Sequence, residues 1–183
     1  MSKKRHWLTR LRKHKKLTQQ EVALKVFIDR GYYALIESGE RNPGVEVAKK
    51  LADLIGFHHS VFNLESNPFT SALGHAPMVF AHCDMDLRYT WIFNPPNFGA
   101  DDPIGYRDDE LNRNAGTLAL QRLKQDVIDQ QTPLRRTIPF PTDTGSRSYV
   151  VYCHPLFNDR LELIGVATAA TEVSTTDDNF QGK

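Results

Sequence analysis

The chain has 183 residues, of which 40% are hydrophobic and 25% charged, as in most soluble globular proteins. It contains no run of about 18 apolar residues, which excludes a typical membrane-spanning helix, and its basic N-terminus lacks the apolar segment of a signal peptide. Two cysteines, Cys83 and Cys153, are too few for a disulfide framework, so we expect a cytoplasmic protein.

The net charge of +1 conceals an uneven distribution. Residues 1–60 contain 13 lysines and arginines against 6 acidic residues, while residues 61–183 contain 10 against 16. A basic first third beside an acidic remainder suggests one module that faces phosphate and another that faces something else. A solvated helix face over Lys3–Lys16 would give the same excess of charge, so the motifs must decide between the two interpretations.

Five helical patterns occupy the first part of the chain. Apolar residues at helical spacing predict helices over residues 5–15, 44–55 and 59–64. Between the first and second of these ranges, Leu17–Pro43 reads LTQQEVALKVFIDRGYYALIESGERNP and predicts two more short helices.

Capping residues define these two helices. Thr18 and Glu21 can form a capping box at the start of the first helix, Asp29 can cap the second, and Gly39 ends it. Two helices joined by about four residues, the second short and partly polar, form a helix-turn-helix arrangement.

The ordered segments LTQQEVA, YYALIESGERNP and VAKKLADLIGF resemble the XRE-type (Cro/cI repressor-like) DNA-binding family over residues 7–64. The resemblance implies that the helix from Asp29 to Ser38 enters the major groove. It also implies that Arg12 pairs with Glu37, which would join the first helix to this recognition helix. The implied DNA-binding residues are Gln19, Arg30, Gly31, Tyr32, Leu35, Arg41 and Asn42.

The chemistry of these side chains leaves several roles open. Gln19 either binds a phosphate at a helix N-terminus or caps its own helix. Arg30 either pairs with a guanine or binds a phosphate, and Tyr32 either stacks on a thymine methyl or donates to a phosphate. Gly31 and Leu35 offer no side-chain hydrogen bonds, so specificity should rest partly on DNA shape.

Two residues depart from the family pattern. Glu40 stands where a lysine is frequent, which weakens the local attraction for phosphate. Phe27 stands where a turn glycine is frequent, so the turn must avoid a positive φ or be strained.

The pattern changes after residues 65–77, which are rich in Ser, Gly, Pro and Asn and read as a linker. The order strand, strand, helices and three further strands predicts a five-stranded antiparallel sheet with helices on one face. The predicted strands are residues 78–84, 87–94, 134–140, 147–157 and 161–171, and the predicted helices are residues 108–111 and 117–130.

The segments DLRYTWIFNP, IGYRDDEL and LIGVATAATEVS resemble PAS sensor domains over residues 78–173. The predicted fold class is therefore α+β with two domains. An all-α, five-helix helix-turn-helix domain (1–64) and a linker (65–77) precede a five-stranded antiparallel PAS-like sensor domain (78–173), and a disordered tail (174–183) follows. The resemblance implies either a small ligand between the sheet and the long helix, or a dimerisation module without a ligand.

Aromatic residues on the predicted strands either wall a ligand pocket or form plain core. They are Tyr89, Trp91, Phe93, Tyr149 and Tyr152. The pairs His82-Cys83 and Cys153-His154 can each direct only one side chain inward, because neighbouring strand residues point to opposite faces. We therefore expect packed strand residues instead of a metal or haem site, and we assign no cofactor beyond an unidentified small ligand.

The sequence carries no catalytic motif that we can identify, so we expect a one-component transcriptional regulator instead of an enzyme. Its expected partners are a palindromic double-stranded DNA operator and a second copy of the chain in a homodimer. The PAS-like domain would sense a small-molecule effector, mediate dimerisation, or do both. In the alternative interpretation, it binds only a partner protein.

Overall fold

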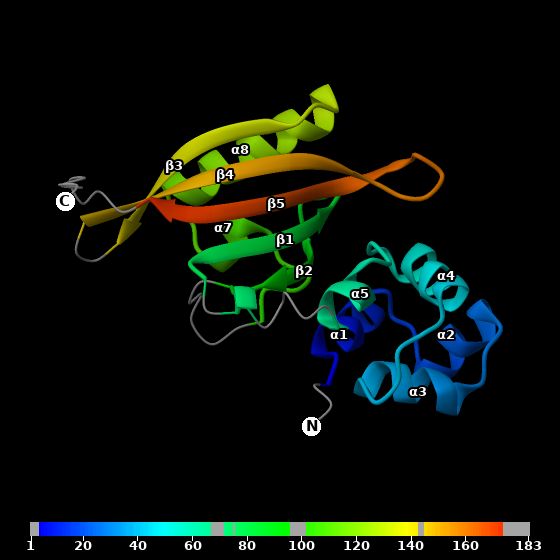
Figure 1. Ribbon diagram of the computed structural model, residues 1–183. Helices are drawn as coiled ribbons and strands as arrows, with labels where there is room; N and C mark the ends of the chain where they lie inside the picture. The colour runs from blue at the N-terminus through cyan, green and yellow to red at the C-terminus, as the bar shows by residue number, and fades with distance from the viewer. Residues whose placement is uncertain (1–3, 67–71, 75, 96–101, 143–144, 174–183) are drawn as a thin grey trace, which may run out of the picture.

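The computed structural model describes residues 4–66, 72–74, 76–95, 102–142 and 145–173. The first part is all helical, as predicted, and in Figure 1 its first and fifth helices face the sheet while its third lies on the far side. No helix among the described residues is long and apolar enough to cross a membrane. The five helices are α1 (His6–His14), α2 (Gln19–Val26), α3 (Arg30–Ser38), α4 (Val45–Ile55) and α5 (Val61–Ser66).

The second part is one antiparallel sheet in the order β2-β1-β5-β4-β3. Its strands are β1 (Met78–Asp84), β2 (Tyr89–Phe93), β3 (Leu134–Thr142), β4 (Gly145–Phe157) and β5 (Leu163–Val173). Between β2 and β3 the chain forms α7 (Asp108–Leu111) and α8 (Ala115–Gln130), and α8 packs against β3, β4 and β5 (Figure 1). This order confirms the PAS-like, α+β fold class.

The predicted caps of the helix-turn-helix form as expected. The Glu21 backbone N–H donates to the Thr18 hydroxyl over 3.2 Å, and the Thr18 N–H donates to the Glu21 carboxylate over 2.7 Å. The Asp29 carboxylate accepts from the N–H groups of Gly31 and Tyr32. Local sequence therefore sets where α2 and α3 begin.

The turn between α2 and α3 adopts the strained alternative. Phe27 has φ 61° and ψ 48° in the left-handed region, and its side chain is 86% exposed. Its N–H still caps α2 by donating to main-chain carbonyls near the end of the helix. The missing glycine therefore leaves the turn in place and strains the backbone.

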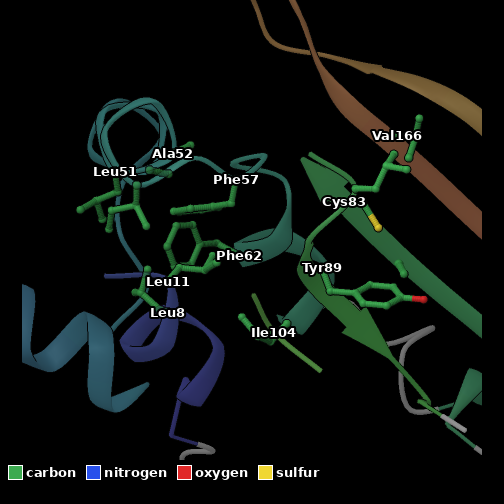
Figure 2. Close-up of a cluster of buried hydrophobic side chains, with 14 of the residues drawn as sticks. Leu8, Leu11, Leu51, Ala52, Phe57, Phe62, Cys83, Tyr89, Ile104 and Val166 are labelled. Carbon is green, nitrogen blue, oxygen red and sulfur yellow. The ribbon is translucent and has the colours of Figure 1, made fainter. Parts of the chain in front are cut away.

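The two parts touch through apolar and charged groups. Figure 2 shows Ile104 beside Leu8 and Phe62 of the helical part and near Tyr89 of the sheet, and all four belong to one buried cluster. A charged contact lies in the β4–β5 hairpin, where the carboxylate of Asp159 is 2.8 Å from Lys49 Nζ of α4 and 3.1 Å from the ring of His59.

The expected domain boundaries remain a prediction. Helix α5 continues to Ser66, two residues past the expected end of the first domain. Residues 67–71 and 75 of the expected linker and the whole expected disordered tail lie outside the described residues.

Candidate nucleic-acid interface and sensor core

Helix α3 divides its residues between the core and solvent. Tyr33, Ile36 and Glu37 are buried, whereas Arg30 is exposed and Leu35 is 38% exposed. The helix itself lies away from the sheet in Figure 1. Within the described structure, the exposed N-terminal side chains of α3 are therefore accessible to a partner.

Gly31 has a local structural role beside its expected role at DNA. A Cβ at this position would lie 2.9 Å from the Asp29 carboxylate oxygen that caps α3. Glycine therefore allows this cap, and it also lets a partner approach the backbone closely.

Two expected contact residues pack on each other at the end of the motif. The Arg41 guanidinium lies 5.3 Å from the ring centre of Tyr32, so it holds a positive charge beside the first turn of α3. Gln19 is the first residue of α2 and is half-buried. These positions fit contacts with phosphates on either side of α3.

Asn42 has a partner inside the protein. Its side-chain oxygen accepts a hydrogen bond from Arg5, which is itself only 4% exposed. Arg5 also donates to the carbonyl of Ile36 over 2.6 Å and to the carboxylate of Glu65 over 2.6 Å. Asn42 therefore helps to hold the end of α3 against α1 and α5, and only its amide N–H groups stay available to a phosphate.

Sequence reasoning missed Arg5. It lies in a run of basic residues that read as a solvated face, and its partners are 31 to 60 residues away in the sequence. The run itself gave no signal that one of its members is buried.

The expected pair of Arg12 and Glu37 is present. Two nitrogens of Arg12 donate to the two carboxylate oxygens of Glu37 over 2.9 and 2.8 Å, and a third donates to the Leu17 carbonyl over 2.7 Å. Burial is the largest single influence and opposes ionisation of Glu37, but the hydrogen bonds from Arg12 and Thr9 and the charge of Arg12 together keep the pKa of Glu37 below its usual value. The pair fixes the orientation of α3 relative to α1.

A second buried ion pair fills the space between the sheet and α8. Lys124 Nζ lies 2.6 Å from a carboxylate oxygen of Asp108, and the two side chains are 0% and 2% exposed. The Tyr89 hydroxyl donates to the other Asp108 oxygen over 2.6 Å. Burial disfavours the charged amine, yet its surroundings, including the Asp108 carboxylate, hold the pKa of Lys124 well above its usual value.

This second pair was also missed, although one signal was present. Lys124 follows Leu120 by four residues and precedes Val127 by three, which places it on the apolar stripe of α8. A lysine on such a stripe needs a buried partner. Its partner, Asp108, starts a different helix, and nothing local connects the two residues.

The five aromatic residues expected at a ligand pocket do not share a face, which corrects the prediction. A β-bulge in the β1–β2 pairing sets Tyr89 opposite Cys83 but Trp91 opposite His82. Tyr89 therefore faces α8 and Trp91 faces away. Tyr149 likewise shares a face with buried Ile138, whereas Phe93 and Tyr152 lie on the outer face with Trp91.

The cysteines and histidines also divide between the faces. Cys83 and Cys153 are fully buried on the side of α8, whereas His82 and His154 lie on the outer face. Each dipeptide thus turns only one side chain inward, as predicted. Within the described ranges, the structure brings together no group of three or more His, Cys, Asp or Glu suited to a metal ion.

Comparison with known proteins identifies the first part of the chain. The helix-turn-helix family matches residues 8–62. The uncharacterised HTH-type transcriptional regulator YqaF of Bacillus subtilis is 45% identical over 58 residues, which are 32% of this chain and 76% of YqaF.

Two plant proteins match longer stretches. Histidine kinase 5 of Arabidopsis thaliana is 31% identical over 134 residues, and probable histidine kinase 1 of Oryza sativa is 35% identical over 104 residues. The matches cover 72% and 56% of this chain but only 13% and 11% of the kinases.

Solved structures resemble the chain only loosely. A dimer of VqmA from Vibrio cholerae superposes with a TM-score of 0.49 and 14% identity, covering 57% of this chain and 49% of VqmA. A PAS domain from Colwellia psychrerythraea gives a TM-score of 0.47 and 10% identity, covering 63% and 99% of the two chains. The PAS-like assignment therefore rests on the strand order and the placement of α7 and α8.

Proposed function

We propose a function from one premise: this chain belongs to the helix-turn-helix family of DNA-binding transcriptional regulators through residues 8–62. In our proposal it is a one-component regulator that docks α3 in the major groove of an operator. The PAS-like domain supplies the signal that changes this binding. The observation that supports docking best is the exposure of Arg30 and Gly31 at the start of α3, a helix whose orientation is fixed by the Arg12–Glu37 pair.

Arg30 is the proposed direct reader of sequence. It is the first residue of α3, its side chain is exposed, and the Asp29 cap fixes the backbone beside it. An arginine at this position can reach a guanine edge with two hydrogen bonds. Gln19, Tyr32, Arg41 and the Asn42 amide would bind phosphates, and Gly31 and Leu35 would pack closely against the groove.

A single helix-turn-helix reads only half of a palindrome, so we propose that the chain acts as a homodimer in the cytoplasm. We also propose that a small molecule changes the geometry of this dimer, which requires different affinities of the molecule for two states. Contacts between the two domains, such as those of Ile104 and Asp159 with the helical part, give a signal in the sheet a route to α3.

The test of the DNA-binding role begins with selection of a preferred duplex from random sequences by the full chain. Arg30→Ala should weaken binding to that duplex by about 10- to 100-fold and reduce discrimination at one base pair. Arg113→Ala, which removes the same charge from an exposed site in the sensor domain, serves as the control. Unchanged affinity and discrimination in Arg30→Ala would remove this residue from base readout.

A second candidate function is interaction with a partner protein through a sensor domain that holds no ligand. It is favoured by the Lys124–Asp108 pair and Tyr89, which fill the space where PAS domains hold ligands. Mass spectrometry of the purified full chain under native conditions distinguishes the two. A bound small molecule would contradict the interaction-only function.

A further inference from the structure

The outer face of the sheet, opposite α8, contains an apolar cavity of about 430 Å³. Its walls come from β1, β2, β4 and β5, and Leu64 of α5 closes one side. Cavities of about 300–1,000 Å³ are the usual size for small-molecule sites. The side chains that matter most here are Phe80, His82, Trp91, Phe93, Tyr152 and Ala169.

The shape of the walls favours a flat molecule. The rings of Trp91 and Phe93 lie within 15° of parallel, with their centres 6.4 Å apart. The strand register sets Phe93 opposite Phe80 and Trp91 opposite His82. Aromatic side chains arranged in this way offer ring faces and edges for a planar aromatic ligand.

One polar group in the wall lacks a partner. His82 is 9% exposed, and its Nδ1 is buried without a hydrogen bond within the described structure. Its ring is 5.4 Å from the ring of Trp91 and 6.1 Å from that of His58, centre to centre. A buried polar atom without a partner costs free energy. His82 lines the cavity, so a turn of its ring that brings this nitrogen to a ligand would recover that free energy.

We propose that this outer-face cavity binds a small, planar, mostly apolar aromatic molecule that donates one hydrogen bond to His82. The bound molecule lies between the sheet and α5, so it touches both the sensor domain and the helical domain. This site is on the opposite face of the sheet from the ion-paired core beneath α8. Its use as a signal site rests on the proposed regulatory function, whereas binding itself does not.

Two probes that differ by one hydroxyl test the proposal on the full chain. Calorimetry should show 2-naphthol binding at one site per chain, about fivefold more tightly than naphthalene, because only 2-naphthol can donate to His82. His82→Phe keeps an aromatic ring but removes the nitrogen, so it should bring the two affinities to about the same value.

Filling the cavity provides the second arm. Ala169→Leu places extra atoms in the cavity wall and should weaken 2-naphthol binding by more than about tenfold. Thr171→Leu is the matched control, because it lies two residues further along β5 on the same face but does not line the cavity. It should bind 2-naphthol as the unaltered chain does.

Equal 2-naphthol binding by the unaltered chain and Ala169→Leu would overturn the proposal. So would the absence of binding together with a dimer that Ala169→Leu dissociates, since the face would then belong to a second copy of the chain. Affinity for the selected duplex, measured with and without saturating 2-naphthol, tests the signal role separately. If 2-naphthol binds without changing the affinity for DNA, the binding site stands but its signal role is removed. The test of DNA binding with Arg30→Ala does not depend on this result.

Discussion

The helical domain and the sensor domain each bury one ion pair, and the two pairs are built differently. Arg12 meets Glu37 through two parallel hydrogen bonds and has a further bond to a main-chain carbonyl. Lys124 meets Asp108 through one contact, and the second oxygen of Asp108 is taken by the Tyr89 hydroxyl. The planar guanidinium fixes a relative orientation of two helices, whereas the ammonium acts as a point charge.

This difference matches what each domain has to position. In the helical domain the pair connects α1 to α3, so it fixes the element that we propose enters DNA. In the sensor domain the pair connects α8 to the start of α7 and, through Tyr89, to β2. The Arg12–Glu37 pair orients the proposed DNA-facing helix, whereas the Lys124–Asp108 pair fills the interior of the sensor domain.

Removing one member of each pair gives the largest expected effects. Arg12→Met and Lys124→Met each leave a buried carboxylate unpaired and should each cost about 3–5 kcal/mol in the free energy of unfolding. The domains should respond separately. Denaturation can be followed in each domain by its own tryptophan, Trp7 in the helical domain and Trp91 in the sensor domain, after replacing the other with phenylalanine.

Arg12→Met should destabilise the domain reported by Trp7 and abolish DNA binding, while Lys124→Met should act mainly at Trp91. The control is the double variant Lys124→Met/Asp108→Leu, which removes both charges and should recover part of the lost stability, because the buried Tyr89 hydroxyl then loses its acceptor. Identical losses at both tryptophans for each single variant would show that the two domains unfold as one unit.

Lowering the pH should destabilise the two domains over different pH ranges, by less than the loss of an ion pair. Burial lowers the pKa of His82 from 6.5 to about 4, so the unfolded chain takes up a proton there at a higher pH than the folded chain. The stability that depends on neutral His82 is complete above pH 6.5 and is lost as the pH falls toward 4. At pH 5 the expected loss is about 2 kcal/mol.

In the helical domain, the stability that depends on Glu37 is lost only at a lower pH. Its pKa is lowered, so its contribution persists until the pH falls below its ordinary value of 4.5. The pKa of His58, which faces His82, is lowered by burial and by neighbouring His59, so it adds some acid sensitivity of its own. Urea titrations of His82→Phe at pH 5 and pH 7 isolate the effect of His82. A stability difference as large as in the unaltered chain would contradict the assignment.

The features that the sequence predicted are those whose causes are local. The Thr18 and Asp29 caps involve residues two or three positions apart, so the helix starts can be predicted from the sequence alone. The Arg12–Glu37 pair spans 25 residues, and only the family resemblance indicated it. The five-stranded antiparallel sheet followed from the order of elements and the PAS resemblance together.

The features that it did not predict depend on geometry between distant segments. Arg5 and Lys124 are buried by partners that no local pattern connects to them. The aromatic residues were expected either at one pocket or in plain core, and Tyr89 and Trp91 are two positions apart, which normally places them on one face. The bulge inserts an extra residue in β2 and reverses this rule. Tyr149 and Tyr152 are three positions apart, so alternation alone could have separated them.

The smallest expected effects concern one backbone feature that both domains share. Phe27 caps the C-terminus of α2 and Gln131 caps that of α8, and both residues have left-handed φ values, 61° and 52°. Glycine adopts this conformation without the steric cost that Cβ imposes, although it also gives the unfolded chain more freedom. Phe27→Gly and Gln131→Gly should therefore each stabilise the chain by about 1 kcal/mol.

The side chains make the two substitutions unequal. Phe27 is 86% exposed, and its ring lies 5.9 Å from Lys50 Nζ, a contact that glycine would remove at a cost of about 0.5 kcal/mol. The gain should therefore be smaller at Phe27 than at Gln131 in thermal unfolding followed at Trp7 and Trp91. Phe27→Ala is the control, because it removes the ring but keeps Cβ and should be slightly destabilising. If Phe27→Gly and Phe27→Ala have equal stability, the left-handed turn is not a source of strain.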